Sequence, residues 1–201
     1  MRRQPIYFFV DIYATLSIEE TLSIENSLIN FIKSCRQNPQ AIESVYLSIN
    51  NLCESNYCVN KLTALLDFKS SNLQSQKKRN FNHIFNLINK DFKNDLTYTT
   101  INQKGGYTPF VFFFINSDIG YDDINNINEF KKQKANTFII VSNKINDLKI
   151  LKNISNEIYI LNEIDIYTLY SKFYYSGDPS FLPRSERIEN NYLNENINLK
   201  K

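Results

Sequence analysis

The chain has 201 residues, of which 42% are hydrophobic and 14% aromatic, enough for the core of one α/β domain. Its formal net charge of +2 argues against a nucleic-acid binder that depends on neutralising phosphates. No apolar stretch reaches the roughly 20 residues that a membrane-spanning helix needs. The three cysteines leave at least one unpaired, and no charged-then-apolar signal segment opens the chain, so we expect a cytoplasmic protein.

Six segments have the apolar, β-branched and aromatic composition of strands. In chain order they are 6–11, 44–51, 57–63, 109–116, 137–142 and 157–161. Helical periodicity falls between most of them, at 18–36, 80–93, 123–134, 145–154 and 164–175. In the first helix the apolar residues that recur near helical spacing are Leu22, Leu28, Ile29 and Ile32, and Pro39 ends it. The two shorter, more polar helices at 123–134 and 145–154 are predicted to lie on the surface.

The connections between these segments predict how the strands pair. Only residues 52–56 separate the second strand from the third, which indicates a hairpin. The other consecutive strands are joined through helices, which indicates parallel crossovers. The predicted fold is therefore α/β, a doubly wound (Rossmann-like), mostly parallel six-stranded sheet with one antiparallel edge strand and helices on both faces. We expect this domain to span residues 1–176 and to be followed by a polar, partly disordered C-terminal tail at 177–201.

The first strand is the most informative part of the chain for function. It is apolar on both faces, which suits a central strand covered by helices on each side. Asp11 stands at its carboxyl end, where open α/β sheets bind ligands. The hydroxyls of Thr15 and Ser17 that follow are also ordinary helix caps, and Glu20 three residues after Ser17 completes a capping-box pattern.

Several motifs occur in the same order as in a known family. They are Met-Arg-Arg-Gln-Pro (1–5), Asp-Ile-Tyr-Ala-Thr (11–15), Cys-Arg-Gln-Asn-Pro (35–39) and Pro-Phe-Val-Phe-Phe-Phe (109–114). Together with the strand order they resemble the von Willebrand factor A (VWA) fold. The closer resemblance is to the bacterial TerY-like group found with tellurium-resistance genes, and it covers roughly residues 1 to 175.

The resemblance implies a metal site whose ligands have mostly been replaced. The family holds a divalent cation with an Asp, two Ser, a Thr and a second Asp. Here Asp11 and Thr15 remain, whereas Tyr13, Arg79 and Asn116 stand in the places of the other ligands. A hard cation needs several compact oxygen ligands at once, so we expect no cofactor. The Arg79 guanidinium could instead pair with Asp11 and replace the charge of the metal.

The function that the resemblance implies is a non-enzymatic protein–protein interaction module, without catalytic residues. Its partner would bind without metal at the C-terminal edge of the sheet. The binding rim would consist of Asp11, Tyr13, Thr15, Arg79, Asn116 and Tyr121. The implied setting is a tellurium-resistance, stress or conflict-type bacterial system, with a kinase or phosphatase encoded nearby as the partner and with no role for nucleic acid or a membrane span.

Two alternatives remain open on the sequence. The first keeps the cation, with Asp11, Thr15 and a water-mediated Asp118 coordinating Mg²⁺ in a ligand-binding VWA domain. The second is an enzyme, a hydrolase or nucleotide binder on a doubly wound sheet. The sequence offers that enzyme no paired carboxylates, no nucleophile with its base and no glycine-rich phosphate loop.

Overall fold

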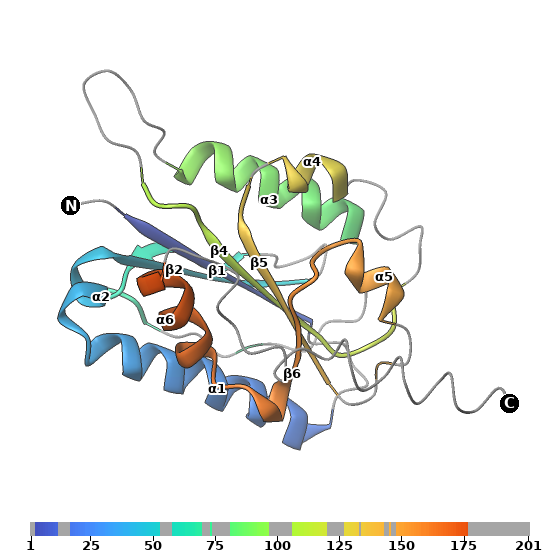
Figure 1. The fold of residues 1–201 in the computed structure, drawn as a ribbon, viewed down its shortest axis with the longest axis horizontal. Coiled ribbons are helices and arrows are strands. Elements are labelled where there is room, and N and C mark those ends of the chain that lie inside the picture. The colour runs from blue at the N-terminus through green and yellow to red at the C-terminus, as the bar shows by residue number, and fades with distance from the viewer. Residues whose placement is uncertain are drawn as a thin grey trace, which may run out of the picture.

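The computed structural model describes residues 3–11, 17–52, 58–69, 73, 81–96, 106–119, 127–132, 134–142, 145 and 148–176. In this part of the chain, two layers of helices enclose a six-stranded sheet (Figure 1). The strands are β1 (Gln4–Val10), β2 (Val45–Asn51), β3 (Cys58–Ala64), β4 (Phe110–Ile115), β5 (Asn136–Val141) and β6 (Ile158–Ile160). The helices are α1 (Ile18–Arg36), α2 (Pro39–Ser44), α3 (Phe81–Asp95), α4 (Ile127–Lys131), α5 (Lys149–Lys152), the short 3-10 helix η2 (Leu161–Glu163) and α6 (Ile166–Ser176).

The order of the strands is β3-β2-β1-β4-β5-β6. All neighbouring pairs are parallel except β2 and β3, which form the predicted antiparallel hairpin at one edge. The predicted fold class is therefore confirmed. The strand order reverses direction at β1, because β2 lies on one side of it and β4 on the other. Such a switch point opens a crevice at the carboxyl ends of the strands, and in open α/β sheets ligands bind there.

The two central strands are buried on both faces. Every residue of β1 and of β4 is buried. Phe8, Phe112 and Phe138 stack across three strands on one face, with ring centroids 5.2 and 5.0 Å apart, and Phe9 and Phe113 stack at 5.2 Å on the other. Neighbouring rings at these separations attract each other beyond the area that they bury. The sequence-predicted double-sided burial of the first strand is confirmed.

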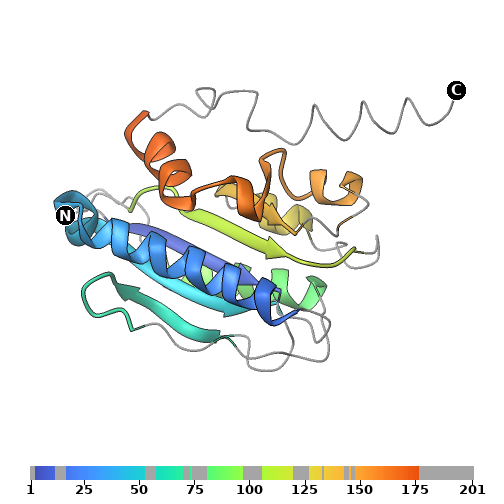
Figure 2. The same cartoon turned by 90° about the horizontal axis from the view of Figure 1, so that it is seen from below.

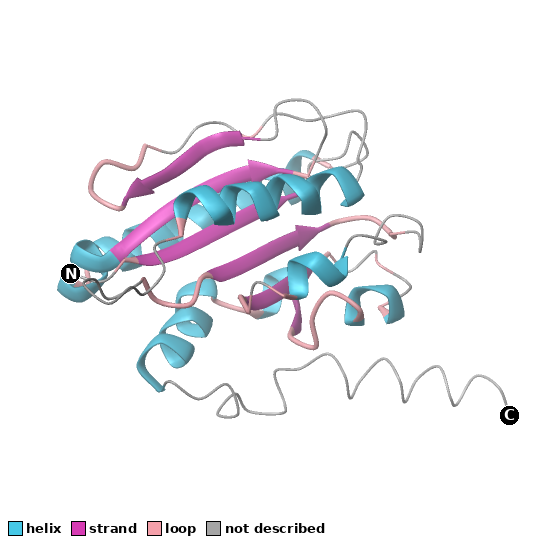
Figure 3. Ribbon diagram, turned by 90° about the horizontal axis from the view of Figure 1, so that it is seen from above, coloured by secondary structure: helices cyan, strands magenta, loops and turns pink. Residues whose placement is uncertain are grey.

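Each face of the sheet has its own set of helices. The face with Phe8 packs against α1, α2 and α6 (Figure 2), and the face with Phe9 packs against α3, α4 and α5 (Figure 3). Although short, α4 and α5 bury Phe130 and Leu151 against the sheet, so they are more than the polar surface helices that we expected.

At the amino end of the sheet, the Gln4 Nε2 donates to the carbonyl of Thr108, 104 residues away, at 2.9 Å.

The start of α1 is fixed by a capping box, as predicted. The Glu20 amide donates to the Ser17 Oγ at 3.2 Å, and the Ser17 amide donates to the Glu20 carboxylate at 2.9 Å. The same helix ends before Pro39, but a second helix, α2, begins there and was not predicted. The Asn38 side-chain oxygen accepts from the amides of Gln40 and Ala41, at 3.0 and 3.3 Å. A proline that ends one helix is well suited to the first turn of the next.

Of the four apolar residues that recur near helical spacing in α1, only Leu28 and Ile32 are buried. Leu22 is 50% exposed and Ile29 is 38% exposed. The residues of α1 that are buried against the sheet are Ile24, Leu28, Phe31, Ile32 and Cys35. The apolar side of this helix is wider than the part that faces the sheet, so spacing alone did not decide which of its residues are buried. The predicted tail at 177–201 lies outside the described residues.

Two leucines of α1 test this assignment of its faces. Leu28→Ala should lower the free energy of unfolding by about 2–5 kcal/mol, because it removes a buried side chain and leaves a cavity. Leu22→Ala, the matched change on the exposed face, should cost no more than about 0.5 kcal/mol. Urea unfolding of the two variants and the unchanged protein measures the difference. Equal losses would show that the helix is rotated from the position described.

Candidate functional site

A row of buried polar side chains lies at the carboxyl ends of four adjacent strands. Asn51, Asp11, Asn116 and Ser142 stand at or just after the ends of β2, β1, β4 and β5, and the most exposed of them is 8% exposed. We call this row the carboxyl edge. Backbone bonds align it: the Asp11 amide donates to the Phe114 carbonyl at 2.9 Å, and the Ser142 amide donates to the Ile115 carbonyl at 3.2 Å. These four residues therefore lie side by side along one edge of the sheet.

Asp11 is held at the centre of the row by three hydrogen bonds from the segment that follows β4. Its Oδ2 accepts from the Asn116 amide at 3.4 Å and from the Ser117 hydroxyl at 3.2 Å. The Asn116 Nδ2 donates to the Asp11 main-chain carbonyl at 2.6 Å. The Ser142 hydroxyl extends the network by donating to the Asn116 carbonyl at 3.4 Å. The donors stabilise a carboxylate that is only 2% exposed.

The side chain at position 116 has to be a donor in this arrangement. Its nitrogen faces a carbonyl oxygen, which can only accept a hydrogen bond. An aspartate at 116 would place a charged acceptor against that carbonyl and beside the Asp11 carboxylate. The amide therefore does two things: it joins the ends of β1 and β4, and it avoids a second negative charge in a buried site.

The structure describes only part of the predicted rim. It brings Asp11 and Asn116 together, and it places Asp118 in an exposed position just after them. The other predicted rim residues, Tyr13, Thr15, Arg79 and Tyr121, lie outside the described residues. The pairing of Arg79 with Asp11 therefore stays a prediction.

Sequence reasoning missed three polar residues at this edge of the sheet. Asn51, Ser117 and Ser142 were not singled out, although each is a polar residue at or just after the end of a buried strand. That position is the signal that could have found them, because the ends of parallel strands meet at one edge of the sheet. Asp11 and Asn116 were identified because they stand at the positions of metal ligands in the family. The residues that form hydrogen bonds with them are not at ligand positions and were not identified.

Two properties of the described residues bear on metal binding and on nucleophilic attack. Among them, no group of three or more His, Cys, Asp or Glu side chains could hold a metal ion. Burial raises the pKa of the Cys35 thiol to about 12, so at neutral pH it is not the thiolate that would act as a nucleophile. Burial also raises the pKa of the Asp95 carboxyl at the end of α3, opposed by a hydrogen bond from Tyr7 and by the charge of Lys61.

None of the helices in the described part of the chain has the length and apolar character that crossing a bilayer requires.

Comparison with solved structures identifies the fold. Proximal thread matrix protein 1 from the mussel byssus matches with a TM-score of 0.56 and 9% identity, over 84% of this chain and 45% of that one. The pilus adhesin SpaC of Lactobacillus rhamnosus GG matches with 0.55 and 12%, over 85% and 30%. The ArnB paralog VWA2 of Sulfolobus acidocaldarius matches with 0.50 and 9%, over 86% and 44%.

This chain has a VWA-like fold. It spans less than half the length of each of these three structures. No protein-family model and no curated protein matches the sequence. At these identities the likeness establishes the fold alone.

Restoring an aspartate at position 116 tests the network. Asn116→Asp should lower the free energy of unfolding at neutral pH by about 1–3 kcal/mol or more, because a buried donor is replaced by a charged acceptor. The loss should shrink in acid, where the new carboxyl becomes protonated and can donate. Asn26→Asp on the exposed face of α1 is the matched control and should change little at either pH. Urea unfolding at two pH values measures both. An Asn116→Asp protein as stable as the control variant would show that the amide does not donate there.

Proposed function

We propose that this chain is a non-enzymatic protein-interaction module of the VWA-like fold, which binds a protein partner at the carboxyl edge of its sheet without a metal ion. The observation that carries this proposal is that hydrogen bonds from within the chain already occupy one oxygen of the Asp11 carboxylate. The Oδ2 of its carboxylate already accepts two hydrogen bonds from Asn116 and Ser117. Each carboxylate oxygen has two lone pairs. The two donors occupy both lone pairs of Oδ2, which are the same lone pairs that would coordinate a cation.

The described surface beside this edge supports a protein partner. α1 begins near the carboxyl edge, because it follows β1 after a short connection. Its first turns expose Ile18 at 80% and Leu22 at 50%, four residues apart on one side of the helix. Large apolar side chains exposed together, next to a polar site, are typical of protein–protein contacts. The aromatic residues Tyr13 and Tyr121 of the predicted rim would extend this apolar surface.

The biological setting is proposed from resemblance. The sequence resembles the TerY-like group, which suits a cytoplasmic protein of a tellurium-resistance, stress or conflict-type bacterial system. A kinase or phosphatase encoded nearby is then the partner to test first. Two of the structural neighbours are named as a pilus adhesin and a thread matrix protein, and such names are compatible with a binding role on this fold.

Melting with and without divalent cations tests the metal-free part of the proposal. A cation that binds only the folded state at a hundredfold excess over its Kd should raise the melting temperature by roughly 5 °C or more. We expect no such shift, so that melting curves in Mg²⁺, in Mn²⁺ and in EDTA superimpose. A clear rise with either cation would instead support the alternative in which Asp11, Thr15 and Asp118 coordinate Mg²⁺.

Partner affinity tests the position of the interface. The partner is first identified by pull-down from the native host and mass spectrometry, and its Kd is then measured for single alanine variants. Ile18→Ala, Tyr13→Ala, Arg79→Ala and Tyr121→Ala should each weaken binding, and a true hot spot should cost about thirtyfold. The matched control is Ile29→Ala, which is on the same flank of α1 but about 16 Å further along the helix. Rim variants that bind as well as the Ile29 variant would place the contact on another surface.

A further inference from the structure

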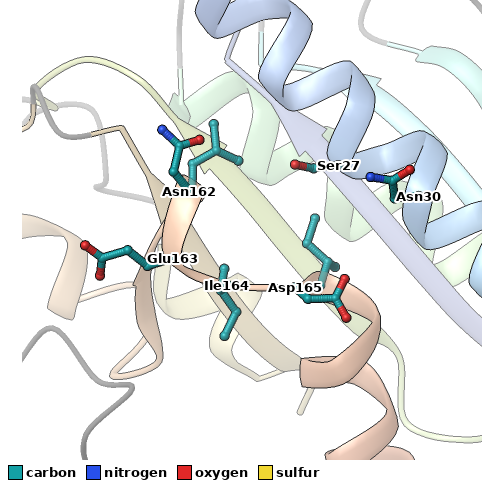
Figure 4. A pocket seen from close by; sticks show the side chains of 8 residues that line it. Ser27, Asn30, Asn162, Glu163, Ile164 and Asp165 are labelled. Atoms are coloured by element: carbon teal, nitrogen blue, oxygen red, sulfur yellow. The ribbon is translucent and has the colours of Figure 1, made fainter.

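A second site is formed where α1 faces the segment that joins β6 to α6. A cavity of about 430 Å³ lies there and opens to solvent (Figure 4). Its lining comes from Ser27, Asn30, Leu161, Asn162, Glu163, Ile164, Asp165 and Ile166. None of these residues belongs to the carboxyl edge, so this site, which we call the α1–α6 groove, is separate from the proposed interface. Its volume lies within the ~300–1,000 Å³ of small-ligand pockets.

The walls of the groove are held by hydrogen bonds of the chain itself. The Ser23 hydroxyl donates to the Asn162 side-chain oxygen at 2.9 Å and so connects α1 to η2. The Asp165 Oδ2 accepts from the Thr168 amide at 2.8 Å and from the Thr168 hydroxyl at 2.5 Å, which caps the start of α6. The groove is therefore formed before any ligand arrives, which reduces the ordering cost of binding.

The lining combines an apolar base with an acidic, polar rim. Leu161 and Ile166 are buried and Ile164 is partly buried, whereas Asn30, Asn162, Glu163 and Asp165 are exposed. In Figure 4 the Asp165 carboxylate lies on the side that faces α1, and the Glu163 carboxylate points outward. The lining contains no Lys or Arg. Glu163 makes no hydrogen bond or ion pair with the described residues, and Asp165 uses only its Oδ2 in bonds to Thr168.

We propose that the α1–α6 groove binds an arginine side chain of a partner protein. An arginine matches the groove in both of its parts. Its aliphatic stem can cover Leu161, Ile164 and Ile166 while its charged head stays at the wet rim. The guanidinium carries five N–H donors, and the rim offers the remaining Asp165 oxygen and the Asn30 amide oxygen as acceptors. The Asp165 carboxylate supplies the complementary charge, and Glu163 adds to the negative charge of the rim.

The test uses small blocked amino acids and the whole 201-residue chain. N-acetyl-arginine methylamide is titrated while the amide chemical shifts of the protein are followed by NMR. The matched probe is N-acetyl-citrulline methylamide, which has the same shape but no charge. We expect saturable shifts at Ser27, Asn30 and 162–166, and binding of the citrulline probe about tenfold weaker or less detectable. Equal binding of the two probes, or shifts that cluster elsewhere, would overturn the proposal.

Two variants distinguish the effect of the negative charge in the groove from an effect on folding. Asp165→Asn keeps a capping oxygen for Thr168, since Asn is as good an N-cap as Asp, but it removes the charge. It should weaken binding of the arginine probe at least fivefold and leave melting unchanged. Asp67→Asn makes the same chemical change at an exposed turn after β3, outside the groove, and should leave the affinity as it was. If the Asp165 and Asp67 variants bind the arginine probe equally well, the groove does not recognise the guanidinium.

Discussion

The burial of β1 and β4 on both faces is the constraint on which the rest of this structure depends. Strands that are apolar throughout can bury their side chains only between two layers of helices, and this requirement accounts for α1, α2 and α6 on one side and α3, α4 and α5 on the other. The same constraint places the polar side chains at the ends of the strands. Inside the two central strands nearly every side chain is apolar, so the first polar groups after them meet at one edge.

At that edge, donor and acceptor chemistry decides what the site can do. Asp11 is a buried carboxylate, and a buried charge needs either a cation or several donors. Asn116 and Ser117 provide donors from within the chain. The carboxyl edge of this VWA-like sheet is therefore held together by hydrogen bonds between β1, β4 and β5. The exposed apolar residues at the start of α1, Ile18 and Leu22, are the surface that we propose for contact with a partner.

The strands and the topology could be predicted from the sequence because each strand is a short apolar run and its connections are either very short or helical. α1 was placed at its observed bounds because its capping box and Pro39 mark both ends. The faces of α1 could not be assigned in the same way, since Leu22, Leu28 and Ile29 are chemically similar and only packing against β1 distinguishes them. In the site, Asp11 and Asn116 were identified, but the direction in which the Asn116 amide points depends on the carbonyl opposite it, which no sequence pattern reveals.

The contact between Gln4 and the Thr108 carbonyl has a consequence for how the chain folds. These residues are 104 positions apart, and the β1–β4 ladder begins beside them. Until β4 has been synthesised, β1 has only β2 beside it in the observed strand order, and one of the most apolar strands of the protein lacks its second neighbour. The β2–β3 hairpin, in contrast, is local and can form early, while closing the long loop to β4 carries a larger entropic cost. We therefore expect the centre of the sheet, although it is the most buried part, to be completed after the edge formed by β2 and β3.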